Sequence, residues 1–194
     1  MTDDGYINYF HVLQLDEDCK SGDVRNSYKR LTKSLLMEIS RTQITDSRRD
    51  AFLLEIAMLN AAFYILRDND LREKYQADRA NVIALEDAWQ NAARNTPESV
   101  DGHRRRFDAA LRHFLSRYME ELVLEAGRDK ECVEASRWSR AHERHASRVL
   151  RHYRQRRYHE IHERLPYYEI TEPQVDWDER RALVQSSLTH ESTA

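Results

Sequence analysis

The side chains best suited to binding chemistry lie in one stretch of the chain, between Arg137 and Arg164. This stretch contains nine arginines, five histidines and only three glutamates. Because arginine donates paired hydrogen bonds to carboxylates and phosphates, the stretch predicts one of three things: a solvated helix face, a docking surface for an acidic protein partner, or a nucleic-acid contact. The candidate residues of this basic arm are Arg137, Arg140, Arg144, Arg148, Arg151, Arg154, Arg156 and Arg157.

Histidines in the same stretch could bind a metal ion or respond to pH. His142 with His145, and His159 with His162, are three residues apart, but no cysteine or carboxylate completes a metal set of known spacing. The run His-Glu-Ile-His-Glu at 159–163 is not the HExxH motif of zinc proteases. We therefore expect no metal site. A separate hypothesis is that protonation near pH 6 increases the positive charge of the arm.

Catalytic signatures are missing from the sequence. It contains no phosphate-binding glycine loop, nucleophile elbow or recognisable Ser/His/Asp set, and its four glycines make a strained catalytic loop hard to build. We expect no enzyme activity and no cofactor. Cys19 and Cys132 lie far apart without a CxxC, which predicts free thiols in a reducing compartment. No apolar run approaches the length of a membrane span, so we expect the cytoplasm or the nucleus.

Composition predicts the fold class. The chain is rich in Arg, Leu, Ala and Glu, which favour helices, and it has few glycines and prolines for the turns of a β-fold. The fold is therefore expected to be all-α. Net charge is −4 over residues 1–100, +5 over 101–165 and −4 over 166–194, which sets the middle segment apart.

Apolar periodicity predicts two long helices in the first half. Val24, Tyr28, Leu31 and Leu35 form one stripe after a start near Ser21. A second stripe follows the start signal at 45–47, and a short helix is expected from Leu71. The second stripe consists of Phe52, Ile56, Leu59, Phe63 and Leu66.

Four blocks in this half occur in the order and spacing of a known family. Asn8-Tyr9-Phe10 to Leu13 is similar to "DYYEVLG", and Ser27-Tyr28-Lys29-Arg30-Leu31 to "AYKRL". Leu59-Asn60-Ala61-Ala62-Phe63 with Ile65-Leu66 is similar to "INEAYEVL", and Asp68, Arg72 and Tyr75 to the closing "D…KR…YD". Residues 6–78 thus resemble a J domain of the DnaJ type. The resemblance implies an N-terminal antiparallel helical domain. It also implies a chaperone-docking face on the first long helix, at Arg25, Lys29, Arg30 and Lys33.

The chain departs from this family at its functional loop. J domains carry His-Pro-Asp after the docking helix, and the aspartate promotes ATP hydrolysis by a DnaK-type chaperone. Leu36, Met37 and Glu38 occupy these positions here. Since all three favour helices and no proline interrupts them, we predict that the helix continues to about Ser40. Stimulation of a chaperone ATPase is not expected.

The second half predicts a connecting helix and linker at 79–102, a basic helical hairpin at 103–166 and an acidic, partly disordered tail at 167–194. One hairpin stripe contains Phe107, Leu111, Phe114, Tyr118 and Leu122 and ends at Gly127. The other helix is expected from about 131 to 164, up to Pro166. Because the tail is acidic and the arm basic, the tail could fold back onto it.

Together these features predict a non-catalytic J-like adaptor or co-chaperone-related protein that works through protein–protein interaction. Its expected partner is a DnaK-type chaperone or another J protein. The alternative is a nucleic-acid-associated protein that binds through the Arg/His-rich helix. No membrane partner is expected.

Overall fold

The computed structural model describes residues 6–41, 46–95, 99–165 and 181; the expected disorder and fold-back of the tail lie outside these residues. The described residues form helices and no strands, which confirms the all-α expectation. None of the described helices combines the length and the apolar character that crossing a membrane requires.

Four helices form the first half of the chain. The short α1 (Tyr9–Val12) begins at Asn8, whose side chain accepts hydrogen bonds from the backbone N–H groups of Phe10 and His11. It is followed by α2 (Ser21–Arg41), α3 (Asp46–Leu66) and α4 (Asn69–Asn95). The predicted short helix from Leu71 and the predicted connecting helix are therefore parts of one helix, because Tyr75, Val82 and Trp89 form a single buried stripe along α4.

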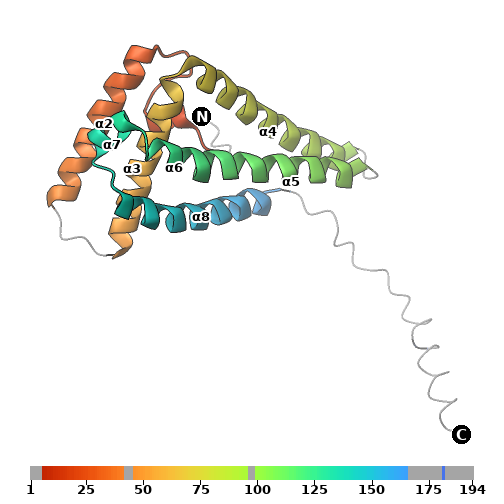
Figure 1. Ribbon diagram of the computed structural model, residues 1–194. Coiled ribbons are helices and arrows are strands. Elements are labelled where there is room, and N and C mark those ends of the chain that lie inside the picture. Colours follow the sequence, from red (N-terminus) through yellow and green to blue (C-terminus); the bar gives the residue numbers. More distant parts are fainter. Residues whose placement is uncertain (1–5, 42–45, 96–98, 166–180, 182–194) are drawn as a thin grey trace, which may run out of the picture.

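The second half folds back along the first. A continuous helical rod consists of α5 (Val100–Ser116), a π-helical turn η2 (Arg117–Glu121) and α6 (Leu122–Ala126). It leads through α7 (Lys130–Ser136) to α8 (Arg140–Glu163). Figure 1 shows α4, the α5–α6 rod and α8 extending together to one side, while α2 and α3 cross their other end. The predicted stripe from Phe107 to Leu122 is buried, as expected.

Helix α3 is the centre of the molecule. It contacts α1, α2, α4, α6, α7 and α8, and small residues at Ala57, Ala61 and Ala62 allow neighbouring helices to approach closely. On its outer side the Tyr28 ring of α2 stacks on Phe63, with ring centroids 4.2 Å apart. Residues from both halves form one hydrophobic cluster. The second half thus completes the core of the first.

Candidate docking groove

Two of the four sequence-predicted docking residues, Lys29 and Lys33, line a groove between α2 and α7, where the second half of the chain meets the first. The groove has a volume of about 460 Å³. Positions 29, 33, 36 and 37 fall on one face of α2 because of the helical period, and the opposite wall comes from α7. The lining residues are Lys29, Thr32, Lys33, Leu36, Met37, Ser40, Glu134, Ala135 and Arg137.

Charged contacts at the start of α7 fix this wall. Asp129 caps α7 by accepting a hydrogen bond from the backbone N–H of Cys132 at 3.1 Å. The Arg67 guanidinium, at the end of α3, donates to both Asp129 oxygens at 2.7 and 3.1 Å and to Glu131 at 3.0 Å. Burial alone would raise the pKa of Asp129, but the Arg67 and Cys132 hydrogen bonds outweigh it and lower that pKa. The Asp129 carboxylate thus both caps α7 and links it, through Arg67, to the end of α3.

A buried polar network joins α2 and α7, the two walls of the groove, through α3. The Tyr28 hydroxyl of α2 donates to the Asn60 side-chain oxygen of α3 at 2.9 Å. The Asn60 amide donates in turn to the Ser136 hydroxyl of α7 at 3.0 Å, and Ser136 donates to the Cys132 carbonyl at 2.6 Å. Asn60 is fully buried, so water cannot reach it and its polar atoms must find their hydrogen-bond partners within the protein. These hydrogen bonds therefore fix the positions of α2, α3 and α7 relative to one another.

The helix predicted from 131 to 164 is wrong in one respect, because it is interrupted at residues 137–139. Arg137 ends α7 in the left-handed conformation, at φ 56° and ψ 29°. Trp138 is then buried against Gly127, where an added Cβ would lie 2.7 Å from the indole Nε1. Ser139 caps α8 in a reciprocal arrangement with His142. Burial of the indole ring, a tertiary contact, therefore outweighs the local preference for a continuous helix.

The four predicted docking residues do not all face the groove. Lys29 and Lys33 line it. Arg25 points toward α7, where its guanidinium lies 3.7 Å from the Glu131 carboxylate. Arg30 instead donates hydrogen bonds to Gln14 at 3.0 Å and to Ser27 at 3.2 Å, on the side of α1. The groove thus uses half of the predicted face.

Residues 36–38, which the resemblance aligns with His-Pro-Asp, are helical, as predicted, since α2 runs without a break to Arg41. Leu36 and Met37 line the groove, whereas the exposed Glu38 does not. The Ser40 hydroxyl points back along the helix and is shared between the carbonyls of Leu36 at 2.7 Å and Met37 at 3.1 Å. At these positions the structure has a continuous helix, and two of the three side chains contribute to one wall of the groove.

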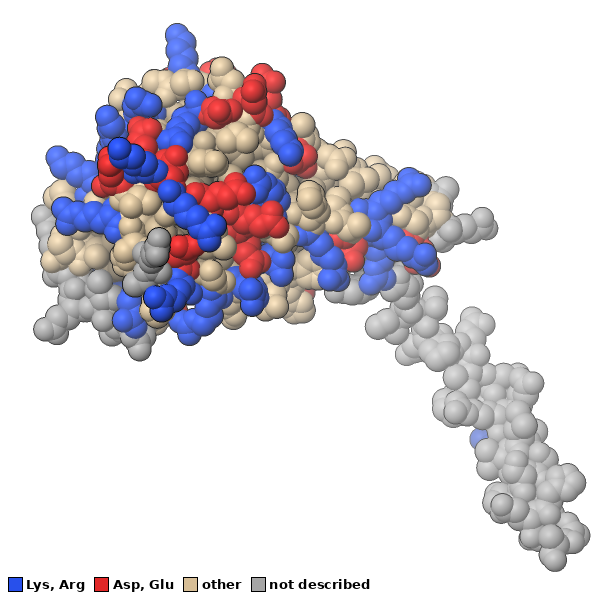
Figure 2. All heavy atoms as spheres, in the orientation of Figure 1, with Lys and Arg blue, Asp and Glu red and all other residues tan. Residues whose placement is uncertain are grey.

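The predicted basic arm lies along α8, except for Arg137, which precedes this helix and lines the groove. Figure 2 shows acidic side chains gathered among arginines and lysines over the middle of the molecule, so this face is not uniformly basic. Arg144 is exposed, and the side chain of Arg140 is outside what the structure describes. Carboxylates lie within ion-pair distance of the other arginines: Asp50 near Arg148, Glu120 near Arg151 and Arg154, and Glu160 near Arg156 and Arg157. The predicted nucleic-acid and acidic-partner roles of this arm stay predictions.

The histidine pairs are oriented toward different neighbours. His142 Nδ1 accepts from the Ser139 N–H at 3.3 Å, and burial, followed by the nearby His145, lowers the pKa of His142. The His162 ring lies beside those of Trp89 and Phe107 with its Nε2 3.1 Å from Asp108, and burial lowers its pKa despite that carboxylate. Among the described residues, no three His, Cys, Asp or Glu side chains are placed to share a metal ion. The predicted increase in charge near pH 6 stays a prediction, and these two histidines oppose it.

Sequence reasoning missed the α7 wall of the groove, which Glu134 and Ala135 provide. A signal was present, because Ser139 is a favourable N-cap residue and the buried Trp138 precedes it. The sequence alone does not show that Trp138 packs against Gly127. Comparison of the whole chain with protein-family models, curated proteins and solved structures found no match.

Proposed function

We propose that the chain is a non-catalytic J-like adaptor whose α2–α7 groove binds an acidic segment of a protein partner. One observation carries this proposal: Lys29 and Lys33 line the same groove as the apolar side chains of Leu36 and Met37. Met37 is 45 % exposed, the highest value for a large apolar side chain among the described residues. Exposed apolar surface beside cations suits a partner that presents both apolar and acidic side chains.

The charge balance of the groove supports an acidic partner. Lys29, Lys33 and Arg137 contribute three positive charges to the lining, against the single carboxylate of Glu134. The remaining charge of +2 faces solvent and would steer an acidic segment toward the groove.

The resemblance to J domains supports a DnaK-type chaperone, or another J protein, as the first partner to test. The continuous helix through Leu36, Met37 and Glu38 supports binding without activation. In this proposal, the docking surface is retained and extended by α7, while the loop that promotes ATP hydrolysis is replaced by helix.

The test measures binding of the full chain to a DnaK-type chaperone and, in parallel, the single-turnover ATPase rate of that chaperone. We expect measurable binding and an unchanged rate. The double charge reversal Lys29→Glu with Lys33→Glu should weaken binding at least about tenfold. Lys74→Glu, which reverses an exposed lysine on α4, is the matched control and should leave binding unchanged.

Two results would contradict the proposal separately. Clear stimulation of the ATPase rate would refute the non-catalytic role. Equal affinity of the doubly reversed variant and the Lys74→Glu control would refute the groove as the docking site.

A further inference from the structure

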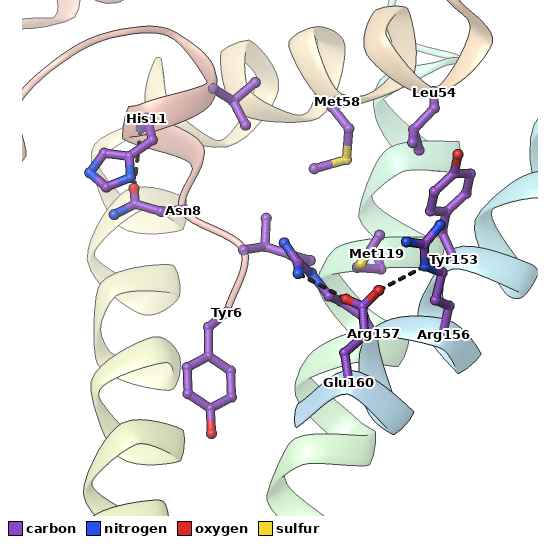
Figure 3. A pocket seen from close by; sticks show the side chains of 12 residues that line it. Tyr6, Asn8, His11, Leu54, Met58, Met119, Tyr153, Arg156, Arg157 and Glu160 are labelled. Carbon is purple, nitrogen blue, oxygen red and sulfur yellow. Dashed lines mark hydrogen bonds and ion pairs between the residues drawn. The ribbon is translucent and has the colours of Figure 1, made fainter. Parts of the chain in front are cut away.

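A second groove lies on a different part of the molecule, where α1, α3, η2 and α8 meet. Its volume is about 450 Å³, within the range of about 300–1,000 Å³ that is typical of small-molecule sites. Figure 3 shows side chains from these four elements converging on it. None of its residues lines the α2–α7 groove.

Apolar side chains form the floor of this groove. Val12, Leu54 and Met58 are only partly buried by the protein itself, so a ligand that covers them would remove further apolar surface from water. Met58 and Met119 point into the same space (Figure 3). Methionine is flexible and polarisable, which lets such a floor adapt to an aliphatic chain.

The π-helical turn η2 places Met119 at this floor. A π-turn inserts an extra residue into a helical rod, weakens its regular hydrogen bonding and is frequently found at functional sites. Here the turn lies in the interior of the α5–α6 rod and faces α8. The irregular backbone and the open groove therefore occur at the same place.

Two arginines on α8 form the rim and share one carboxylate. Arg156 donates to Glu160 at 2.7 Å and Arg157 at 3.0 Å. Figure 3 shows one guanidinium on either side of the Glu160 carboxylate. The Arg156 hydrogen bond is the main cause of the lowered pKa of Glu160. Each guanidinium carries five N–H groups, so this trio has a net charge of +1 and donors for one further anion.

We propose that this groove binds an amphiphilic monocarboxylate, with its aliphatic chain on the methionine floor and its carboxylate against Arg156 and Arg157. A monoanion matches the net charge of the trio. A cationic amphiphile would be repelled by the two guanidiniums, and a neutral alcohol would forgo the charge-assisted hydrogen bonds. The proposal depends neither on the J-domain resemblance nor on the docking groove.

The experiment uses the full chain labelled with ¹³C in the methionine methyl groups, and sodium decanoate as the probe below its micelle-forming concentration. The chain has four methionines, of which Met58 and Met119 line this groove and Met37 lines the other. We expect saturable methyl shifts at Met58 and Met119 and none at Met37. Decanol and decyltrimethylammonium should bind at least about tenfold more weakly than decanoate.

A double variant, Arg156→Gln with Arg157→Gln, should also weaken decanoate binding by about tenfold. Arg144→Gln, which changes an exposed arginine of α8 outside the groove, should leave it unchanged. Shifts that fail to saturate, equal shifts at Met37, or decanol binding as tight as that of decanoate would each overturn the proposal. The head-group comparison requires no variant, so it remains decisive if the double variant misfolds.

Discussion

Replacement of Gly127 by alanine should destabilise the protein, although alanine is normally the better helix residue. The backbone at Gly127, φ −67° and ψ −9°, suits alanine. An added Cβ, however, would lie 2.7 Å from Nε1 and 2.8 Å from Cε2 of the buried Trp138 ring. Overpacking of this kind costs about 1–3 kcal/mol, while the backbone preference for alanine returns at most about 1 kcal/mol. We expect a net loss of about 1 kcal/mol.

The matched control is Gly102→Ala. Gly102 lies in α5, is exposed, and has no heavy atom within 4 Å of an added Cβ. Without a steric term, the same substitution should stabilise the protein by about 0.5–1 kcal/mol. For a chain of this length, 1 kcal/mol corresponds to about 2–4 °C in Tm. The two variants should therefore melt on opposite sides of the wild type.

Thermal unfolding followed by far-UV circular dichroism measures both changes, and urea unfolding gives the free energies independently. Tryptophan fluorescence adds a second probe. The emission sums over three tryptophans, and displacement of the Trp138 indole by the added methyl group should shift part of it. If the Gly127→Ala variant melts at or above the wild-type temperature, the close packing of Trp138 on Gly127 is wrong. The turn that places the α7 wall of the docking groove would then need another explanation.

Two further predictions concern the contacts that link the walls of that groove to α3. Asn60→Ala removes the acceptor of the Tyr28 hydroxyl and the donor to Ser136. It should lower the free energy of unfolding, measured in urea, by about 1–3 kcal/mol. Asn26→Ala, at an exposed site, is the control, and a smaller loss for Asn60→Ala than for this control would contradict the network. Asp129→Asn keeps the helix cap but loses the charge facing Arg67, so at pH 7 it should cost about 1–2 kcal/mol. Because folding lowers the pKa of Asp129, this stabilisation is present above pH ~4 and is lost as the pH falls through the lower folded pKa; a difference between Asp129→Asn and wild type that persists unchanged at pH 2 would contradict the assignment.

Much of the core can be predicted from helical spacing alone. Phe63, Leu66, Phe107 and Leu111 are each at most 2 % exposed, because an apolar stripe at this period has no other stable place than against another helix. The fold class follows for the same reason. Periodicity does not say which stripes face one another, however, so the central position of α3 among six helices is not foreseeable from it.

Half of the candidate groove is predictable from the sequence. Lys29, Lys33, Leu36 and Met37 can be recognised from their places in the J-like pattern. The α7 wall cannot, because it depends on the left-handed Arg137 and on the packing of Trp138 against Gly127 across the turn between α6 and α8, which no helical period specifies. The arginines of the arm form one surface in the sequence pattern. Glu160 can be recognised from its helical spacing to Arg156 and Arg157, but Asp50 and Glu120 come from other helices, and local sequence patterns do not show that they lie near the arm.

The central position of α3 has a consequence for synthesis of the chain on the ribosome. The Tyr9 hydroxyl bonds to the Tyr118 carbonyl, and Asn60 to Ser136, so the first-half core waits for partners made much later. About 100 residues separate the end of α3 from Leu165, which takes about 5–20 s at ordinary translation rates. During that interval the apolar faces of α3 lack the cover that α6, α7 and α8 provide in the finished fold, so aggregation-prone apolar surface stays exposed until the second half has been made.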